Sequence, residues 1–307
     1  MDDVILTSPC IAVAHDDAYA AHATVTLLSV LDHSPGARLF AIVPTDFRQE
    51  PEMRRALGSA LTLIRIATEQ FAGLKTWVGG SVAAYTRLAL AETLPLRRVI
   101  YLDSDVIVRH DLTQLWATEL SGAVLGAVPD VAFADRERLG FSSTGPYFNS
   151  GVLLIDLDRW RQENVGAQTL AWAQANPERM SWSDQCAMNW VLQGRWRALD
   201  PTWNMQAQQF GGSTRWGFRF DRRQKGDPAI VHFTMPNACG RLSDAEGKPW
   251  RFLCEHPWRH SYIRTLARTP WLHPRFDDNF PHNRITRLLR RRASWALPIY
   301  LRLREII

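Results

Sequence analysis

The amino-acid sequence predicts an α/β fold built on a mostly parallel sheet that is flanked by helices. Short apolar, strand-like runs alternate with segments whose apolar residues recur at helical spacing, as expected for parallel strands joined by crossover helices. Acidic residues follow several of these runs, and ligands of such sheets bind at the carboxyl ends of strands. With 307 residues, 46% of them hydrophobic and 22% charged, the chain has enough apolar material for one large domain and an appendage.

The first half of the chain shows this alternation most clearly. Apolar runs bounded by turn residues predict strands, and helical spacing of Ala, Leu and Val predicts the helices between them. In chain order, the expected elements are a strand over 10–16, a helix over 19–31, a strand over 37–44, a helix over 54–60, a strand over 61–67, a helix over 81–94 and a strand over 99–102.

The second half of the chain is less regular. Residues 147–160 combine a polar start with a long apolar run, and residues 181–194 predict a helix that opens on polar residues. Residues 227–240 are expected to hold a short strand that ends near His232.

The expected strand over 99–102 leads into two carboxylates, Asp103 and Asp105. On a continuous strand this spacing points both side chains to the same face, about 6–7 Å apart. Two like charges about 4 Å apart repel by roughly 4 kcal/mol at an effective dielectric of ~20. A divalent cation would remove this conflict, and oxygen ligands favour Mg²⁺ or Mn²⁺. The alternative is that one aspartate only caps the following turn.

The Asp-x-Asp motif is one of seven short sequence motifs that follow one another from about Ile11 to Trp250. They are AHDDAYA, YTRLAL, YLDSDVIV, YFNSGVLLIDLDRWR, SDQ, VHF and KPW. Together they resemble the family-eight retaining glycosyltransferases, a group that includes glycogenin and bacterial lipopolysaccharide and lipooligosaccharide glucosyl- and galactosyltransferases. The resemblance implies the glycosyltransferase A type of fold, which is Rossmann-like with a mostly parallel mixed sheet. It also implies that Asp103 and Asp105 hold a metal ion.

The resemblance assigns further roles residue by residue. It implies that Mn²⁺, with Mg²⁺ as the alternative, is held by Asp103, Asp105 and His232. The implied donor-binding residues are Ala14, Asp16, Asp17, Arg87, Asp103, Ser104, Asp105, Asn149, Ser150, Asp184, Gln185 and Lys248. Catalysis is assigned to Gln185, beside the anomeric carbon, and to Asp184. The acceptor side is assigned to Asp130 and Trp182.

Three features depart from the family pattern. Ala18 stands where many members have Asn, so one nucleotide contact is expected to be replaced. Cys186 stands where many members have a second aspartate, which counts against a covalent glycosyl-enzyme formed on a carboxylate there. Fifteen residues separate His232 from Lys248, whereas the family usually has only a few.

The expected function is metal-dependent, retaining transfer of a hexose from UDP-glucose or UDP-galactose to a glycan or glycolipid acceptor, such as a lipopolysaccharide-type precursor. Two other classes remain as alternatives. A haloacid-dehalogenase-type phosphohydrolase also uses Asp-x-Asp with Mg²⁺, but there the pair normally ends the first strand. A catalytically silent binding protein would be indicated by loss of metal ligands, whereas Asp103, Asp105 and His232 are all retained.

Several features of the sequence favour a cytoplasmic protein. Its four cysteines form no Cys-x-x-Cys pair, which favours a reducing compartment. The N-terminus lacks the basic and apolar regions of a signal peptide, and no apolar run approaches the ~20 residues that span a bilayer.

Basic residues concentrate at the C-terminus. From Arg284 to Ile307 the chain has seven arginines and one acid, a net charge of +6, so the rest carries about −1. Apolar residues share this segment at partly helical spacing, which is typical of attachment to anionic lipid. We therefore expect a nucleotide-sugar-binding catalytic domain over 1–270 and a basic amphipathic segment over 271–307 that places the protein at the inner face of the plasma membrane. A tail docked on its own domain is the alternative, and nucleic acid is not an expected partner.

Truncation after Pro281 is expected to cost several kcal/mol of affinity for anionic vesicles, at roughly 1 kcal/mol per basic side chain near the surface. Salt should weaken the binding of the full-length protein, because exposed charges are screened within about 8–10 Å. Vesicle sedimentation measures both effects. Equal pelleting of the two proteins would show that the tail is a docked structural element.

Overall fold

The computed structural model describes residues 8–76, 81–130, 133, 136–142, 145–214, 217–221, 223, 226–234, 248–250, 254, 256–271 and 296. The expected basic segment over 271–307 lies outside these residues except for Trp271 and Ala296, so its role stays a prediction. The chain forms two compact units. Unit 1 comprises Met1–Met205 and Asp227–His232, and unit 2 comprises Gln206–Gly226 and Phe233–Ile307.

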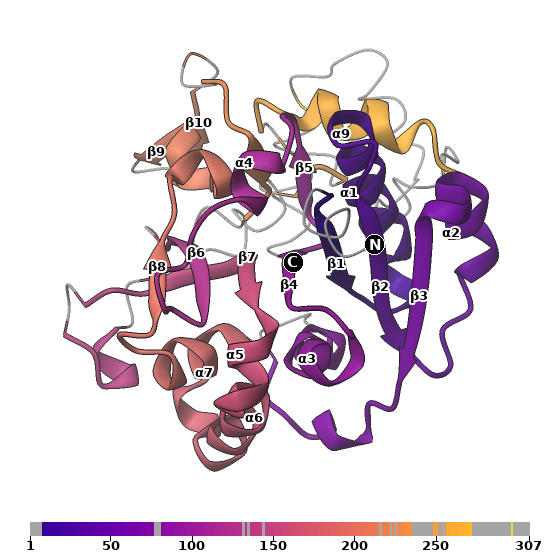
Figure 1. Ribbon diagram of the computed structural model, residues 1–307. Helices are drawn as coiled ribbons and strands as arrows, with labels where there is room; N and C mark the ends of the chain where they lie inside the picture. The colour runs from indigo at the N-terminus through magenta and orange to yellow at the C-terminus, as the bar shows by residue number, and fades with distance from the viewer. Residues whose placement is uncertain are drawn as a thin grey trace. The chain divides into compact units, whose positions relative to one another are not determined.

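Unit 1 is built on a seven-stranded sheet with the strand order β3-β2-β1-β4-β7-β6-β8 (Figure 1). The strands are β1 (Cys10–Ala14), β2 (Arg38–Pro44), β3 (Leu61–Ile66), β4 (Arg98–Leu102), β6 (Leu125–Pro129), β7 (Phe148–Asp156) and β8 (Trp196–Ala198). Only β7 runs antiparallel to its neighbours β4 and β6, while all other pairs are parallel. The predicted mostly parallel mixed sheet is confirmed.

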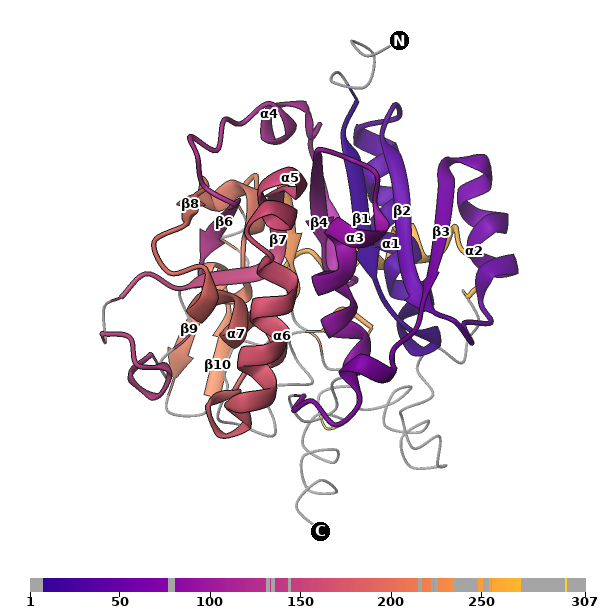
Figure 2. The same ribbon diagram turned by 60° about the horizontal axis from the view of Figure 1, so that its bottom comes forward.

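Helices flank this sheet. The α-helices of unit 1 are α1 (Ala20–His33), α2 (Glu50–Leu57), α3 (Leu90–Thr93), α4 (Thr113–Trp116), α5 (Leu157–Gln162), α6 (Val165–Ala175) and α7 (Ser183–Val191). Short 3₁₀ helices are η1 (Asp17–Tyr19), η2 (Gly58–Ala60), η3 (Glu69–Phe71), η4 (Val82–Ala89), η5 (Glu137–Leu139), η6 (Pro177–Arg179) and η7 (Pro201–Asn204). Figure 2 shows α3, α5 and α6 in front of β4 and β7.

A separate two-stranded ribbon leaves the main sheet after β4. In this ribbon β5 (Val106–Val108) pairs antiparallel with β11 (Ile230–His232), so that His232 lies opposite Val106. Helix α1 holds β5 from its other side, because Thr26 Oγ1 donates to Val106 O at 3.0 Å and Ser29 Oγ accepts from Val108 N at 2.9 Å. The chain between β4 and β5 is thereby fixed in place.

Unit 2 contains η8 (Ala207–Phe210), the antiparallel hairpin of β9 (Gly211–Thr214) and β10 (Gly217–Phe220), and α9 (Arg259–Leu266). His256 is buried against the rings of Phe210 and Phe233, with centroids 5.0 and 4.7 Å away. This burial lowers the pKa of His256 to about 3, so the ring is neutral at physiological pH.

Several helices and strands predicted from the sequence are present, with ends that differ by a few residues. The four strands expected in the first half are confirmed as β1 to β4. The helix expected over 54–60 instead begins at Glu50, with a proline in its first turn, a position where the missing N–H costs no hydrogen bond. The helix expected over 81–94 is a 3₁₀ helix that becomes α-helical only at Leu90.

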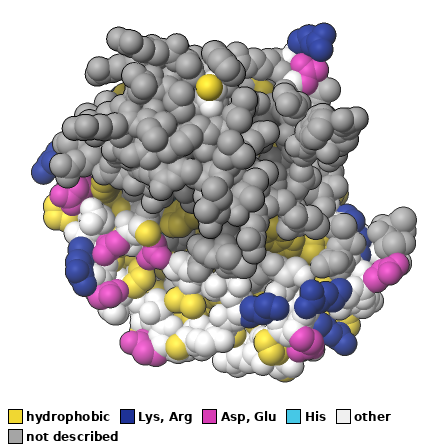
Figure 3. All heavy atoms as spheres, turned by 180° about the vertical axis from the view of Figure 1, so that it is seen from behind, with side chains coloured by type: hydrophobic (Ala, Val, Ile, Leu, Met, Phe, Trp, Pro, Cys, Tyr) yellow, Lys and Arg dark blue, Asp and Glu magenta, His cyan; other side chains and the backbone are white. Residues whose placement is uncertain are grey.

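No helix among the described residues is long and apolar enough to span a membrane. Over the described part of the face in Figure 3, basic and acidic side chains are interspersed. This agrees with the nearly neutral charge of the chain before Arg284.

Candidate active site

The fold brings Asp103, Asp105 and His232 together. Their ligand atoms all lie within 4.8 Å of one another, and within the described ranges no other group of His, Cys, Asp and Glu meets this criterion. His232 Nε2 lies 3.2 Å from Asp105 Oδ1 and 3.8 Å from Asp103 Oδ2. His232 and Asp105 are buried, whereas the Asp103 side chain is 24% exposed. We call these three residues the carboxylate–histidine cluster.

The two aspartates do not continue strand β4, as the spacing argument assumed. Strand β4 ends at Leu102, and Asp103 to Asp105 turn the chain into β5. The turn forms because the chain leaves the main sheet here to pair with β11. It is held by Asp103 N, which donates to Gly151 O at 2.8 Å. The carboxylates therefore converge through a turn and not through alternation along one strand.

The donor set of the carboxylate–histidine cluster suits a divalent cation. Two carboxylates and one imidazole nitrogen are ligands that Mn²⁺ accepts, and the oxygen ligands also suit Mg²⁺. Carboxylates gathered in a partly buried place repel one another, and a cation would compensate them.

The imidazole of His232 lies directly against the backbone of β7 at Gly151. A Cβ atom at Gly151 would stand 2.1 Å from His232 Cε1 and 2.9 Å from Asp103 Oδ2. No side chain fits at these distances, so glycine is required here for the close approach of the ring and not for a special backbone conformation.

Arg87, from η4, fixes the first carboxylate. Its Nη2 lies 2.9 Å from Asp103 Oδ1, its Nη1 donates to Ser150 O at 2.8 Å, and its guanidinium lies 4.4 Å from the centre of the Tyr101 ring. Tyr101 Oη also donates to Asp103 Oδ1, at 3.0 Å. Asp103 thus uses Oδ1 for protein contacts and directs Oδ2 toward His232.

The same guanidinium adjoins a second carboxylate, Asp184, in the first turn of α7. Arg87 Nε lies 2.9 Å from Asp184 Oδ2. The hydrogen atom on Nε, however, is donated to the backbone carbonyl of Ala84. Burial raises the pKa of Asp184 to about 6, against the lowering effect of Arg87. Arg87 therefore links the carboxylate–histidine cluster to the start of α7.

A buried network of amides and hydroxyls continues from Asp184. Gln185 Oε1 accepts from Ser150 N at 2.9 Å, and Gln185 Nε2 donates to Asp130 Oδ2 at 3.1 Å and to Tyr147 Oη at 3.3 Å. Asn149 Nδ2 donates to the same Asp130 oxygen at 3.2 Å. Four of the predicted site residues therefore form one hydrogen-bonded group. They come from the residue after β6, from β7 and from α7.

Other predicted site residues lie outside this group. Ala14 ends β1, and the Asp16 side chain caps η1 by accepting from Ala18 N and Tyr19 N at 3.0 and 3.3 Å. Asp17 Oδ1 accepts from Arg48 N at 2.8 Å. These contacts show Asp16 in a capping role, and its contact with a nucleotide stays a prediction.

Between Ala14 and Asp16, the buried ring of His15 packs edge-on against Phe47. Its burial lowers the pKa of His15 to about 4, so this ring is neutral at physiological pH.

The remaining assignments are distributed over both units. Ser104 is buried in the turn between β4 and β5, and the half-buried Trp182 precedes α7, where its N–H donates to Cys186 Sγ at 3.2 Å. Lys248 belongs to unit 2, and its ammonium lies 5.8 Å from the centre of the Trp250 ring. Its contact with a diphosphate stays a prediction.

Sequence reasoning missed four residues at the site, namely Tyr101, Tyr147, Gly151 and Asn204. Tyr101 could have been found, because it lies only two residues before Asp103, on the strand that leads into the motif. Nothing in the local pattern indicates Asn204, whose Oδ1 lies 2.9 Å from His232 Nδ1.

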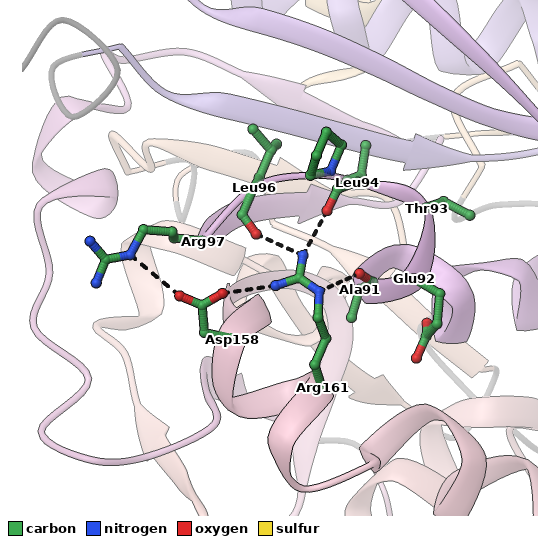
Figure 4. A pocket seen from close by; sticks show the side chains of 9 residues that line it. Ala91, Glu92, Thr93, Leu94, Leu96, Arg97, Asp158 and Arg161 are labelled. Carbon is green, nitrogen blue, oxygen red and sulfur yellow. Dashed lines mark hydrogen bonds and ion pairs between the residues drawn. The ribbon is translucent and has the colours of Figure 1, made fainter. Parts of the chain in front are cut away.

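A separate pocket lies beside the loop between α3 and β4 (Figure 4). Arg161, from α5, donates to the carbonyl of Ala91 in α3 and to two carbonyls of this loop, and it pairs with Asp158. None of the residues that line this pocket is a predicted site residue. They are Ala91, Glu92, Thr93, Leu94, Pro95, Leu96, Arg97, Asp158 and Arg161. With its donors used in this way, Arg161 fastens the loop.

Comparison with known proteins identifies the family. Residues 10–254 match the model of glycosyl transferase family 8. The chain belongs to this family. General stress protein A of Bacillus subtilis is 28% identical over 273 residues, which cover 83% of this chain and 92% of that protein. The lipopolysaccharide 1,2-glucosyltransferase of Escherichia coli K12 is 26% identical over 284 residues, which cover 87% of this chain and 80% of that protein.

The fold agrees with this family. The structure of the galactosyltransferase LgtC in complex with donor and acceptor sugar analogues superposes with a TM-score of 0.71. The two proteins are 24% identical, and the match covers 88% of this chain and 100% of LgtC. The predicted glycosyltransferase A type of fold and the resemblance to family 8 are both confirmed.

Replacing Gly151 by alanine is expected to weaken Mn²⁺ binding by about 10–100-fold, the usual effect of displacing a group that orients a metal ligand. The added methyl group would displace the His232 ring while the core of unit 1 stays intact. Calorimetric titration of Mn²⁺ into the variant measures the effect. Gly36→Ala is the matched control, because a Cβ there meets nothing closer than 3.6 Å. Unchanged Mn²⁺ affinity in Gly151→Ala would contradict this account of the site.

Proposed function

We propose that this family 8 glycosyltransferase is a metal-dependent, retaining hexosyltransferase that moves glucose or galactose from a UDP-sugar to a glycan or glycolipid acceptor. The observation that carries this proposal is the double role of Asp103. It belongs to the carboxylate–histidine cluster and it pairs with Arg87, which adjoins Asp184 and Ser150. A site for a diphosphate-bound cation thus lies next to buried polar groups that suit a sugar.

The relatives support this choice of substrates. One relative is a lipopolysaccharide glucosyltransferase, and LgtC is a galactosyltransferase solved with sugar analogues of donor and acceptor. We take a lipopolysaccharide-type precursor as the acceptor class and the cytoplasmic face of the membrane as the place of reaction, with the basic C-terminal segment as the attachment.

Asp103, Asp105 and His232 would hold the cation, with Mn²⁺ preferred over Mg²⁺ because imidazole is among its ligands. A bound divalent cation supplies Lewis-acid stabilisation of the negative charge that develops on the departing diphosphate. Lys248 would add a compact positive charge at the same diphosphate.

The residues of the chain would contribute mainly position and dipoles. The acceptor hydroxyl oxygen bonds to the anomeric carbon on the face that the diphosphate leaves, while the bond between that carbon and the diphosphate oxygen breaks. The hydroxyl proton passes to a phosphate oxygen, so no side-chain base is needed. Gln185, held by Ser150 and Asp130, would direct its amide dipole toward the positive charge at the anomeric centre.

Family membership sets aside the haloacid-dehalogenase alternative, since the match to family 8 covers residues 10–254. A catalytically silent glycosyltransferase-fold protein is the second candidate. Incubation with UDP-glucose, UDP-galactose and other UDP-sugars in Mn²⁺ or Mg²⁺, with released UDP as the readout, separates the two. Release of UDP from one hexose donor supports the proposal. Binding of UDP with Mn²⁺ but no release from any donor, with or without glycan acceptors, would favour the silent protein.

Asp103→Asn and Asp105→Asn are each expected to abolish Mn²⁺-dependent binding of UDP, because each removes an anionic ligand from the cluster. Calorimetry with UDP in the presence of Mn²⁺ measures this loss. Asp32→Asn, which removes one exposed carboxylate elsewhere, is the control for the change in net charge. Undiminished UDP affinity in either variant would contradict the assignment of Asp103 and Asp105 as metal ligands.

Gln185→Ala is expected to leave UDP binding nearly intact and to slow transfer by about 10–10³-fold, the order of effect of removing one electrostatic contact. Rates from UDP release give the slowing, and NMR of the wild-type product gives its anomeric configuration. The product should keep the configuration of the donor. An inverted product would reject the retaining mechanism.

A further inference from the structure

We infer that Asn204 is a positioning residue that fixes the imidazole of His232 as the tautomer with its proton on Nδ1, so that Nε2 is the free acceptor facing Asp103 and Asp105. Its importance for metal binding rests on the proposed function. The hydrogen-bond geometry itself does not depend on any metal, and it can be followed from a backbone group outward.

The starting point is the backbone N–H of Gly151, which donates to Asn149 Oδ1 at 3.0 Å. A backbone N–H can only donate, so the atom of Asn149 that faces it must be the carbonyl oxygen. The other end of this amide agrees, because Asn149 Nδ2 donates to a carboxylate oxygen of Asp130 at 3.2 Å. The orientation of the Asn149 amide is therefore determined at both ends.

The amide of Asn204 follows from that of Asn149. Asn204 lies 2.9 Å from Asn149 Oδ1, and since this atom accepts, Asn204 must present its NH₂ group there. Its oxygen then faces His232 Nδ1, again at 2.9 Å. Asn204 is fully buried, so water cannot compensate for a flipped amide.

The orientation of the Asn204 amide determines the tautomer of His232. An amide oxygen only accepts, so Nδ1 must carry the proton, and in a neutral ring Nε2 then carries the lone pair. Nε2 is the ring atom 3.2 Å from Asp105 and 3.8 Å from Asp103. The opposite tautomer would place an N–H group between the carboxylates and exclude a cation from the nitrogen.

The backbone keeps Asn204 beside β11 independently of its side chain. Met205, the next residue, donates from its N–H to Ile230 O and accepts from His232 N, both at 2.9 Å. Replacing the Asn204 side chain thus removes the hydrogen bond to the imidazole while the main-chain bonds that hold this segment beside His232 remain.

The first test is NMR of the imidazole ¹⁵N signals in the metal-free, full-length protein. The His232 signals are identified by their absence from the His232→Gln spectrum. We expect the proton on Nδ1 in the wild type and its loss from Nδ1 in Asn204→Ala. A wild-type spectrum with a proton on Nε2 and none on Nδ1 would overturn the inference, and no folded variant of Asn204 is needed for that result.

The second test is Mn²⁺ affinity, measured from the EPR signal of free Mn²⁺. Asn204→Ala is expected to bind Mn²⁺ about 10–100-fold more weakly. Asn204→Asp keeps an acceptor for Nδ1–H although it loses the donor to Asn149 Oδ1, so we expect it to retain the tautomer and to bind Mn²⁺ more tightly than Asn204→Ala.

Asn189→Ala is the matched control, because it also removes a buried, hydrogen-bonded amide. The three hydrogen bonds of the Asn189 side chain go to Phe148 and Gln185 and none goes to His232. It should leave the Mn²⁺ affinity unchanged. Equal Mn²⁺ affinity in Asn204→Ala and the wild type would overturn the inference. Failure of the wild type to bind Mn²⁺ would instead reject the metal centre of the proposed function, and the tautomer measurement would still decide the role of Asn204.

Discussion

The buried guanidinium of Arg87 is the charge on which the candidate site depends. It lies between Asp103 and Asp184 and reaches Ser150 O, so it joins η4, the turn after β4, β7 and the start of α7. Burying carboxylates is costly, and removing one partner of a buried pair typically costs about 3–5 kcal/mol. Since the Asp184 side chain is nearly inaccessible, Arg87 makes its ionised form tolerable and holds the start of α7 beside the carboxylate–histidine cluster.

The pairing of β11 with β5 places the histidine of the carboxylate–histidine cluster beside its aspartates. The register of β11 against β5 places His232 opposite Val106, one residue from Asp105. Hydroxyl groups of α1 take up hydrogen bonds on the free side of β5, so this short strand needs no second neighbour. A hydrophobic helix with Thr26 and Ser29 on one face thereby serves as a support for the carboxylate–histidine cluster.

The sequence predicted those parts of the molecule that depend on local pattern. Apolar runs and breaker residues located β1 to β4, and the resemblance to family 8 pointed to residues that the fold does assemble, including Asp103, Asp105, His232, Arg87 and Gln185. Local pattern could not show that the two aspartates turn away from β4, because that turn follows from the pairing of β5 with β11. It also missed β6 and β8, which owe their place to neighbours distant in sequence. The roles of Gly151 and Asn204 arise only when β7, η7 and β11 meet.

The place of β11 in the chain also bears on how the protein matures on the ribosome. The two aspartates and Arg87 are made early, together with most of the main sheet, whereas the imidazole arrives only with β11, the last strand that unit 1 receives. A nascent chain can therefore condense its sheet and still lack a complete ligand set, since domains fold largely as units during synthesis. The carboxylate–histidine cluster is thus completed only when β11 pairs with β5, and fragments that end before His232 would carry the carboxylates without the imidazole.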